Sequence, residues 1–469
     1  MSTLDALEAA LAVRPVPGAP RPYHFPPFSR GRLSGGLPLL TVHLPGRPLV
    51  AASLVLPAGA VDEPVADGGA AVLAARALTE GTERYDAVAL VEAAERLGAS
   101  IRAEAGWDAT VVGVDVPVDR LAPALDLLAE VVHRPTFPER EVERLRDERL
   151  NDILQARADP GRRADEAFVG AIYEPSSPFA RPAGGLPETV AALDPDACRR
   201  AHRRWPAFDR AGLVVGGDLG GVDVAALAES LFGDLVPDPA MDLVAGPAAG
   251  GAVERTFVRL VHRPGSVQSE IRIGHVGLAR RIPDYHAVAV MSAILGGLFN
   301  SRLNLKLREE KGYTYGAGAG FDLRRLPGPF SARAAVNSEV TVAAIADTLA
   351  ELRRIREVSV DEAELRIARD YLVGVFPLRF ETPGPVVGAL GGLVTHELPD
   401  DELARYRPAI EAVTTADVLA AARDHLDPGR MAIVVVGDAD AVGPGLEAAG
   451  FGPVEVVRDD VPREEAAHG

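Results

Sequence analysis

The hydrophobic and polar positions of the chain follow a pattern that occurs twice. Residues 190–219 (VAALDPDACRRAHRRWPAFDRAGLVVGGDL) and 411–439 (EAVTTADVLAAARDHLDPGRMAIVVVGDA) each predict a helix, a break near a proline and an apolar strand. Both strands end at Gly-Asp, and the pairs Gly217-Asp218 and Gly437-Asp438 lie 220 residues apart. A repeat this long indicates a duplicated domain rather than a solenoid, whose units are much shorter.

The earlier parts of the two halves match more loosely, in the same order. Each half predicts an apolar strand, a helical segment, a strand-like alternation and a long amphipathic helix: 49–60, 70–78, 101–116 and 120–132 in the first half; 267–278, 284–311, 313–325 and 340–356 in the second. Strands interleaved with helices, without regular βαβ alternation, indicate an α+β fold. We therefore expect two similar domains, each an antiparallel sheet backed by helices.

Composition places the domain boundaries. The stretch VPDPAMDLVAGPAAGG, which begins at Val236, is rich in Pro, Gly and Ala and lacks periodicity, which is typical of a linker. The expected order is an N-terminal extension, a first domain, a linker, a second domain and a disordered tail, at 1–39, 40–235, 236–252, 253–457 and 458–469.

Charge and cysteine content narrow the function. The net charge of −18 argues against nucleic acid as a partner, because binding a phosphate backbone needs clustered Lys and Arg. Cys198 is the single cysteine, so no intrachain disulfide can form. The first residues lack the apolar core of a secretory signal, and no stretch approaches the ~18 apolar residues of a membrane span. We expect a cytoplasmic protein with no membrane partner.

Three parts of the chain carry a family resemblance. The first is residues 54–86 (LVLPAGAVDEPVADGGAAVLAARALTEGTERYD), and the second is residues 294–321 (ILGGLFNSRLNLKLREEKGYTYGAGAGF). The third is the helix–strand–Gly-Asp ending that occurs in both halves. Together they resemble the pitrilysin-type, or processing-peptidase-like, zinc metallopeptidases, over a span from about Leu40 to Asp438. In that family the first of these segments surrounds an inverted zinc motif, H-x-x-E-H. The resemblance implies a clam-shaped assembly of four such domains, half of it from this chain.

The zinc motif itself is degenerate. Zinc in such a site takes two histidines at i and i+4 on one helix, with a glutamate as general base and a distant carboxylate. The matching positions hold Val72, Ala75 and Arg76, and no two of the ten histidines have helical i, i+4 spacing. The remote ligand would fall near Asn151 or Asp152. We expect no metal or other cofactor in this chain, and zinc in a partner subunit.

The second half supplies the candidate site. In heterodimeric members of the family the subunit without zinc carries an Arg and a Tyr seven residues apart, which here match Arg308 and Tyr315. Gly312 has the place of a helix C-terminal glycine, so Arg308 falls on the last helical turn and Tyr315 at the start of the next strand. The alternative is structural: an Arg that neutralises the helix dipole and a Tyr that packs.

The resemblance implies a bacterial, non-catalytic subunit. It would pair with an H-x-x-E-H-bearing paralogue, bind peptide substrates and add Arg308 and Tyr315 to the partner's site. Gly296 and Gly297 match a substrate-contacting glycine-rich loop, or they form a plain turn. Two other functions stay open: an inert structural scaffold, and a homodimer that binds peptides without cutting them.

Overall fold

The computed structural model describes residues 18, 21–56, 58–204, 211–235, 251 and 253–458. The expected disordered tail lies outside these residues except for Arg458, and the expected linker lies outside them except for Gly251.

The first half builds one six-stranded sheet, in the order β1-β2-β6-β3-β5-β4. Its strands are β1 (Ser29–Arg32), β2 (Pro38–His43), β3 (Leu49–Leu56), β4 (Ser100–Ala105), β5 (Thr110–Pro117) and β6 (Gly212–Gly217). Its helices are α2 (Ala70–Ala77), α3 (Ala87–Arg96), α4 (Leu121–His133), α5 (Glu139–Ala158), α6 (Pro160–Ile172), α7 (Pro187–Val190), α8 (Pro195–His202) and α9 (Val224–Phe232).

The second half builds another six-stranded sheet, in the order β12-β7-β11-β8-β10-β9. Its strands are β7 (Phe257–His262), β8 (Gln268–Val276), β9 (Ala317–Phe321), β10 (Pro329–Asn337), β11 (Ala432–Gly437) and β12 (Val454–Arg458). Its helices are α10 (Tyr285–Ser292), the π-helical segments η6 (Ala293–Gly297) and η7 (Asn304–Glu310), α11 (Thr341–Glu357), α12 (Glu362–Val375), α13 (Pro383–Thr395), α14 (Glu402–Ala412), α15 (Thr415–His425) and α16 (Ala439–Ala449).

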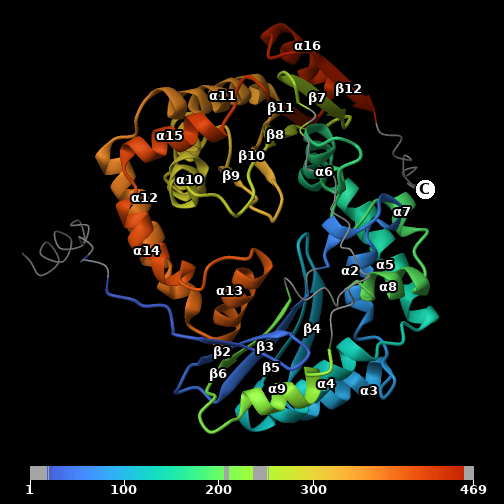
Figure 1. The fold of residues 1–469 in the computed structure, drawn as a ribbon. Helices are drawn as coiled ribbons and strands as arrows, with labels where there is room; N and C mark the ends of the chain where they lie inside the picture. Colours follow the sequence, from blue (N-terminus) through green and yellow to red (C-terminus); the bar gives the residue numbers. More distant parts are fainter. Residues whose placement is uncertain are drawn as a thin grey trace, which may run out of the picture.

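Strand order confirms the duplication and the α+β class. The order β2-β6-β3-β5-β4 matches β7-β11-β8-β10-β9 strand for strand, and the two sheets lie at opposite ends of Figure 1. The sheets are mixed rather than wholly antiparallel: β2 pairs with β6 in parallel, and β7 is parallel to both β11 and β12. Long connections precede β6 and β11, and they allow a parallel pairing that a hairpin would forbid.

The same pair of hydrogen bonds ties the parallel strands in both halves. His43, at the end of β2, accepts the Leu219 N–H at Nδ1 (3.1 Å), and Asp218 accepts the Gly46 N–H (3.4 Å). The second half repeats both bonds, from the Ala439 N–H to His262 (3.0 Å) and from the Gly265 N–H to Asp438 (2.8 Å). This paired bond explains why Gly-Asp recurs after each buried strand.

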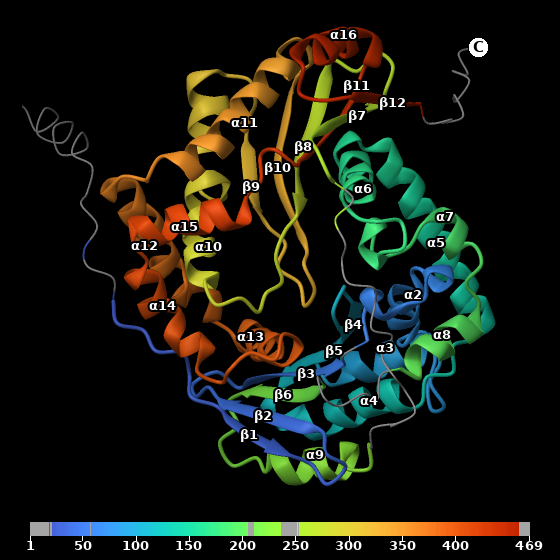
Figure 2. The same cartoon turned by 45° about the horizontal axis from the view of Figure 1, so that its top comes forward.

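The two halves exchange one helix each. Helix α6 belongs to the first half, yet it packs Ala164 and Phe168 against Val434 of the second sheet. Helix α13 belongs to the second half and packs Val387 and Leu390 against β2, β3 and β6 of the first sheet. Figure 1 and Figure 2 both show α6 beside the second sheet and α13 beside the first. The two expected domains therefore correspond to the two sequence repeats, but they do not pack as two independent units.

The expected N-terminal extension also needs correction. Residues 29–32, placed in that extension, form β1 and pair antiparallel with β2. All four residues (SRGR) are exposed, so this strand carries no hydrophobic alternation that the sequence could reveal. The first sheet therefore starts before residue 40.

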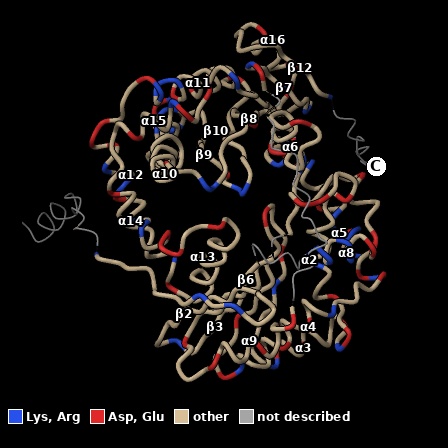
Figure 3. The backbone as a smooth tube through the Cα atoms, in the orientation of Figure 1, with Lys and Arg blue, Asp and Glu red and all other residues tan. Residues whose placement is uncertain are grey.

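Surface charge is mixed throughout. Figure 3 shows acidic and basic positions interspersed over both halves of the tube.

No helix in the described part of the chain combines the length and the apolar character that a bilayer span requires.

The single cysteine is expected to be unreactive in the folded protein. Cys198 lies on α8 with no exposed surface, and burial raises the pKa of its thiol to about 12, so the reactive thiolate is scarce at neutral pH. Ellman's reagent should label it only after denaturation. Ser230→Cys, which adds an exposed thiol on α9, should react at once and serves as the control. Rapid native labelling of Cys198 would contradict the burial.

Candidate functional site

Helix α2, which carries the degenerate zinc motif, is fixed at its N-terminus by a buried ion pair. Glu63 accepts hydrogen bonds from the N–H groups of Gly69 (3.0 Å) and Ala71 (2.5 Å), which the helix leaves unpaired. The Arg181 guanidinium lies 2.6 Å from the same carboxylate. Burial raises the pKa of Glu63, and Arg181 and the two amide groups oppose that rise. The buried ion pair of Glu63 and Arg181 therefore fixes the position of the first turn of α2.

Within the described part of the chain, the face of α2 that matches the zinc motif carries no set of metal ligands. Val72 is partly buried, Ala75 is buried, and Arg76 lies 3.6 Å from Asp152 of α5 in an exposed ion pair. Arg76 and Asp152 are the positions matched to a histidine ligand and to the remote carboxylate. An arginine–aspartate pair therefore stands where the zinc and its ligands would be.

Elsewhere among the described residues, three side chains lie close enough together to hold a metal ion. His262, Asp438 and Asp440 bring their ligand atoms within 4.8 Å of one another. His262 Nδ1 already accepts the Ala439 N–H, and Asp438 accepts N–H groups of Gly265 and Asp440. These bonds tie strand ends together and account for the group without a metal.

Restoring ligands on α2 should create a zinc site. Val72→His with Arg76→His gives two imidazoles at i, i+4 on one helix face, and removing Arg76 frees Asp152 to act as a third ligand. We expect the double variant to retain about one zinc per chain after gel filtration, measured by atomic emission, while the wild type retains none. Adding Asp152→Asn should remove most of that zinc. Equal zinc content in all three proteins would show that α2 and α5 are not placed as a ligand set.

The helix that carries Arg308 ends where the sequence predicts. Gly312 has φ +65, which favours glycine, and its N–H donates to the Arg308 carbonyl (3.1 Å). The Tyr313 N–H donates to the Leu307 carbonyl (2.8 Å). The helical segment expected over 284–311 is interrupted, however, because the chain leaves the helix after Gly297 and re-enters it before Asn304.

The chain reversal at Gly312 leaves Tyr315 in solvent. Tyr315 lies in a bend two residues before β9, rather than at its first position as expected. The Thr314 hydroxyl accepts the Gly316 N–H (3.1 Å) and holds this bend out of the strand. The residue is 96% exposed, so the packing role considered for it has no support.

Arg308 lies beside an exposed aromatic ring. Its guanidinium carbon is 4.5 Å from the centre of the Phe299 ring, and its side chain is 34% exposed. Its nearest carboxylate is that of its neighbour Glu309, at 3.5 Å. Most of its hydrogen-bonding capacity is therefore available to another molecule.

Arg308 and Tyr315 line one groove, as the sequence predicted for the rim they share. The groove has a volume of about 500 Å³. Its other walls come from the end of η6 and from β8 and β10, through Gly296, Gly297, Phe299, Glu270, Arg272 and Arg333. The structure thus brings together every residue proposed for the site in the second half.

The two glycines differ in what they do. A side chain on Gly296 would place its Cβ 2.1 Å from the Ala319 nitrogen, so only glycine allows η6 to approach β9 this closely. A Cβ on Gly297 would meet nothing closer than 3.2 Å. They form the end of a helix that packs on an edge strand, which is neither a long loop nor a tight turn.

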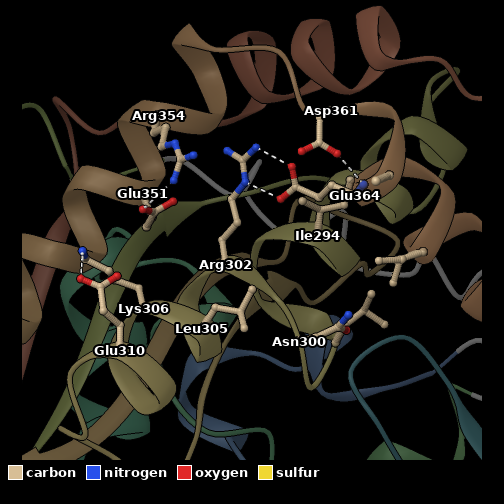
Figure 4. A pocket seen from close by; sticks show the side chains of 13 residues that line it. Ile294, Asn300, Arg302, Leu305, Lys306, Glu310, Glu351, Arg354, Asp361 and Glu364 are labelled. Carbon is tan, nitrogen blue, oxygen red and sulfur yellow. Dashed lines mark hydrogen bonds and ion pairs between the residues drawn. The ribbon is translucent and has the colours of Figure 1, made fainter. Parts of the chain in front are cut away.

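Two side chains that the sequence analysis did not single out connect this region to its neighbours. Arg302 makes a bidentate pair with Glu364 of α12, at 2.7 and 2.8 Å (Figure 4). Asn304 accepts the Ala317 N–H of β9 (2.8 Å) and donates to the Leu298 carbonyl (3.2 Å). Both lie in the quoted SRLNLKLREE segment, so the signal was present as adjacent polar residues in an apolar stretch.

Comparison with known proteins identifies the family. Residues 39–175 match the profile of insulinase (peptidase family M16), and residues 192–372 match that of the peptidase M16 inactive domain. An uncharacterized zinc protease of Streptomyces coelicolor is 28% identical over 416 residues, covering 85% of this chain and 87% of its own. One of Mycobacterium tuberculosis is 26% identical over 413 residues, covering 87% and 92%.

Solved structures agree with this assignment. A peptidase M16 inactive domain from Pseudomonas fluorescens superposes with a TM-score of 0.81 at 26% identity, covering 88% of this chain and 98% of that one. A protease from Helicobacter pylori shares the fold, with a TM-score of 0.80 at 17% identity over 88% and 99% of the chains. The strand order, the duplication and both profile matches point the same way, and the chain belongs to the M16, or insulinase, family of peptidases.

Proposed function

We propose that this chain is the non-catalytic subunit of a two-subunit zinc metallopeptidase. An H-x-x-E-H-bearing paralogue would hold the zinc and the general base, and this chain would add Arg308 and Tyr315 to the peptide-binding site. The observation that carries the proposal is Tyr315, which is 96% exposed at the rim of a groove next to an arginine. A tyrosine with no packing role in its own chain is available to a ligand or partner.

The two side chains suit the chemistry of peptide hydrolysis. Zinc in the partner would supply a Lewis acid and an activated water. The Tyr315 hydroxyl can donate a hydrogen bond to the oxyanion that develops on the attacked carbonyl. The Arg308 guanidinium, which lies over the Phe299 ring, can donate a hydrogen bond to a peptide carbonyl or two parallel hydrogen bonds to a carboxylate.

The edge of the second sheet supports a division of labour between the subunits. Strand β9 lies at that edge, but Gly296 packs against it and Asn304 takes the Ala317 N–H. A peptide that adds as a strand would therefore pair with the partner's sheet edge and present its side chains to this groove. The arginine–aspartate pair at Arg76 agrees with a subunit that has no metal of its own.

Assembly tests the proposal. Sedimentation velocity of this chain, of its H-x-x-E-H-bearing paralogue and of an equimolar mixture should give a 1:1 heterodimer only in the mixture. Tyr315→Phe should leave the sedimentation unchanged, because it removes one exposed hydroxyl. A stable homodimer of this chain that ignores the paralogue would contradict the proposal and favour the homodimeric alternative.

A further inference from the structure

The floor of the groove beside Arg308 is a strip of bare backbone. Gly316, just before β9, and Gly318 line the groove, and Gly320 follows on the same face of β9; these glycines alternate with core-facing residues, so this face of the strand carries no side chains. A Cβ on Gly320 would meet nothing within 4 Å. A ligand can therefore approach this face of the sheet closely.

Arg333 crosses this strip. It pairs with Gly318 in the register of β9 and β10, and a Cβ on Gly318 would lie 3.5 Å from the Arg333 Nε. Ala332 and Ala334, its neighbours on β10, are buried in the core, so Arg333 points to the opposite face, which is the groove. Its side chain is exposed.

The charges in the groove do not cancel. Arg272, opposite Arg333 on β8, forms ion pairs with Asp165 (2.5 Å) and Glu270 (3.0 Å). Glu270 is the acidic residue that lines the groove, and its charge is therefore already paired. Arg333 makes no hydrogen bond or ion pair with any residue in the described part of the chain. Together with Arg308 it gives a locally positive groove in a chain of net charge −18.

We propose that this groove selects peptides that carry an acidic side chain, which Arg333 binds while Arg308 and Tyr315 contact the peptide backbone. The proposal rests on the proposed function and adds its substrate class. A planar guanidinium matches a carboxylate with two parallel hydrogen bonds, and an uncharged isostere cannot replace them.

Matched peptides test this specificity. Fluorescence anisotropy would measure how tightly this chain binds labelled decapeptides. Each peptide is uncharged except at one test position, which is moved along the peptide and holds either Glu or Gln. We expect the Glu peptide to bind on the order of tenfold more tightly at one or two positions. Arg333→Gln should abolish that preference and keep the aliphatic stem over Gly318. Arg353→Gln, an exposed arginine on α11 outside the groove, removes the same charge and should keep it.

Each outcome separates this inference from the proposed function. No Glu preference, or one that survives Arg333→Gln or is lost equally in Arg353→Gln, overturns the inference. The same peptides are then offered to the mixture with the paralogue. Cleavage without an acidic preference leaves the proposed function standing, and an acidic preference without cleavage leaves only the inference. If no peptide binds to this chain alone or to its mixture with the paralogue, and the mixture cuts none, both fail.

Discussion

Tyr315→Phe is expected to lower kcat of the assembled peptidase by ~10²–10³, with little change in KM, because it removes one donor to the developing oxyanion. The hydroxyl is solvent-exposed, so the free energy of unfolding should change by less than about 0.5 kcal/mol. This combination of a large kinetic effect and a negligible structural effect is what a residue used only in the transition state produces.

The measurement is steady-state hydrolysis of a quenched fluorescent peptide by the mixture of both subunits. Tyr371→Phe is the matched control, since Tyr371 is an exposed tyrosine on α12 that does not line the groove. It should leave kcat unchanged. An equal and small effect of both substitutions would return Tyr315 to a passive surface position and favour the scaffold alternative.

The second large effect is on stability. Arg181→Met is expected to lower the free energy of unfolding by ~3–5 kcal/mol, because it leaves the Glu63 carboxylate buried without its partner. The two side chains are only 7% and 1% exposed. Urea-induced unfolding followed by circular dichroism measures the loss. Arg200→Met, which breaks the exposed pair with Asp67, is the control and should cost no more than about 1 kcal/mol.

The loss caused by Arg181→Met should also depend on pH. Burial raises the pKa of Glu63, and removing Arg181 takes away the strongest opposing charge, so the pKa in the variant rises further. A carboxyl whose folded pKa exceeds its unfolded pKa costs stability above that range and none below it. The difference between variant and wild type should therefore shrink as the pH falls from 8 towards 5. A difference that grows on acidification would contradict the assignment.

Sequence patterns predicted the elements well where one sheet face or one glycine decides the local structure. The fully buried strands β6 and β11 followed from apolar runs that stop at Gly-Asp, and the end of η7 followed from Gly312. The motif His-x-Pro-Gly, at His43 and His262, is a further part of the repeat. Its role becomes clear only when the parallel strands lie side by side.

The exchange of helices could not be predicted from the sequence. The pattern of α13 (PGPVVGALGGLVT) shows that its surface must be buried, but not which sheet covers it. Helix α6 presents the same ambiguity. Packing of each helix on the other half's sheet is a long-range choice, and no local periodicity encodes it.

The candidate site, like the fold, could be predicted from the sequence only in part. The spacing of Arg308 and Tyr315 and the shared rim were predicted, because a single glycine reverses the chain between them. The exposure of Tyr315 and the place of Arg333 were not, since they depend on the bend at Thr314 and on the register of β9 against β10. Contacts set by strand register are absent from a linear pattern.

The central claim is that this chain completes a peptidase site whose zinc lies in another subunit. The most direct test measures peptide hydrolysis by this chain alone, by its H-x-x-E-H-bearing paralogue alone, and by their mixture, each with and without a chelator. We expect activity only in the mixture, lost on chelation and restored by zinc. Chelator-sensitive hydrolysis by this chain alone would contradict the account, because it would require a metal site that the Arg76–Asp152 pair excludes from α2.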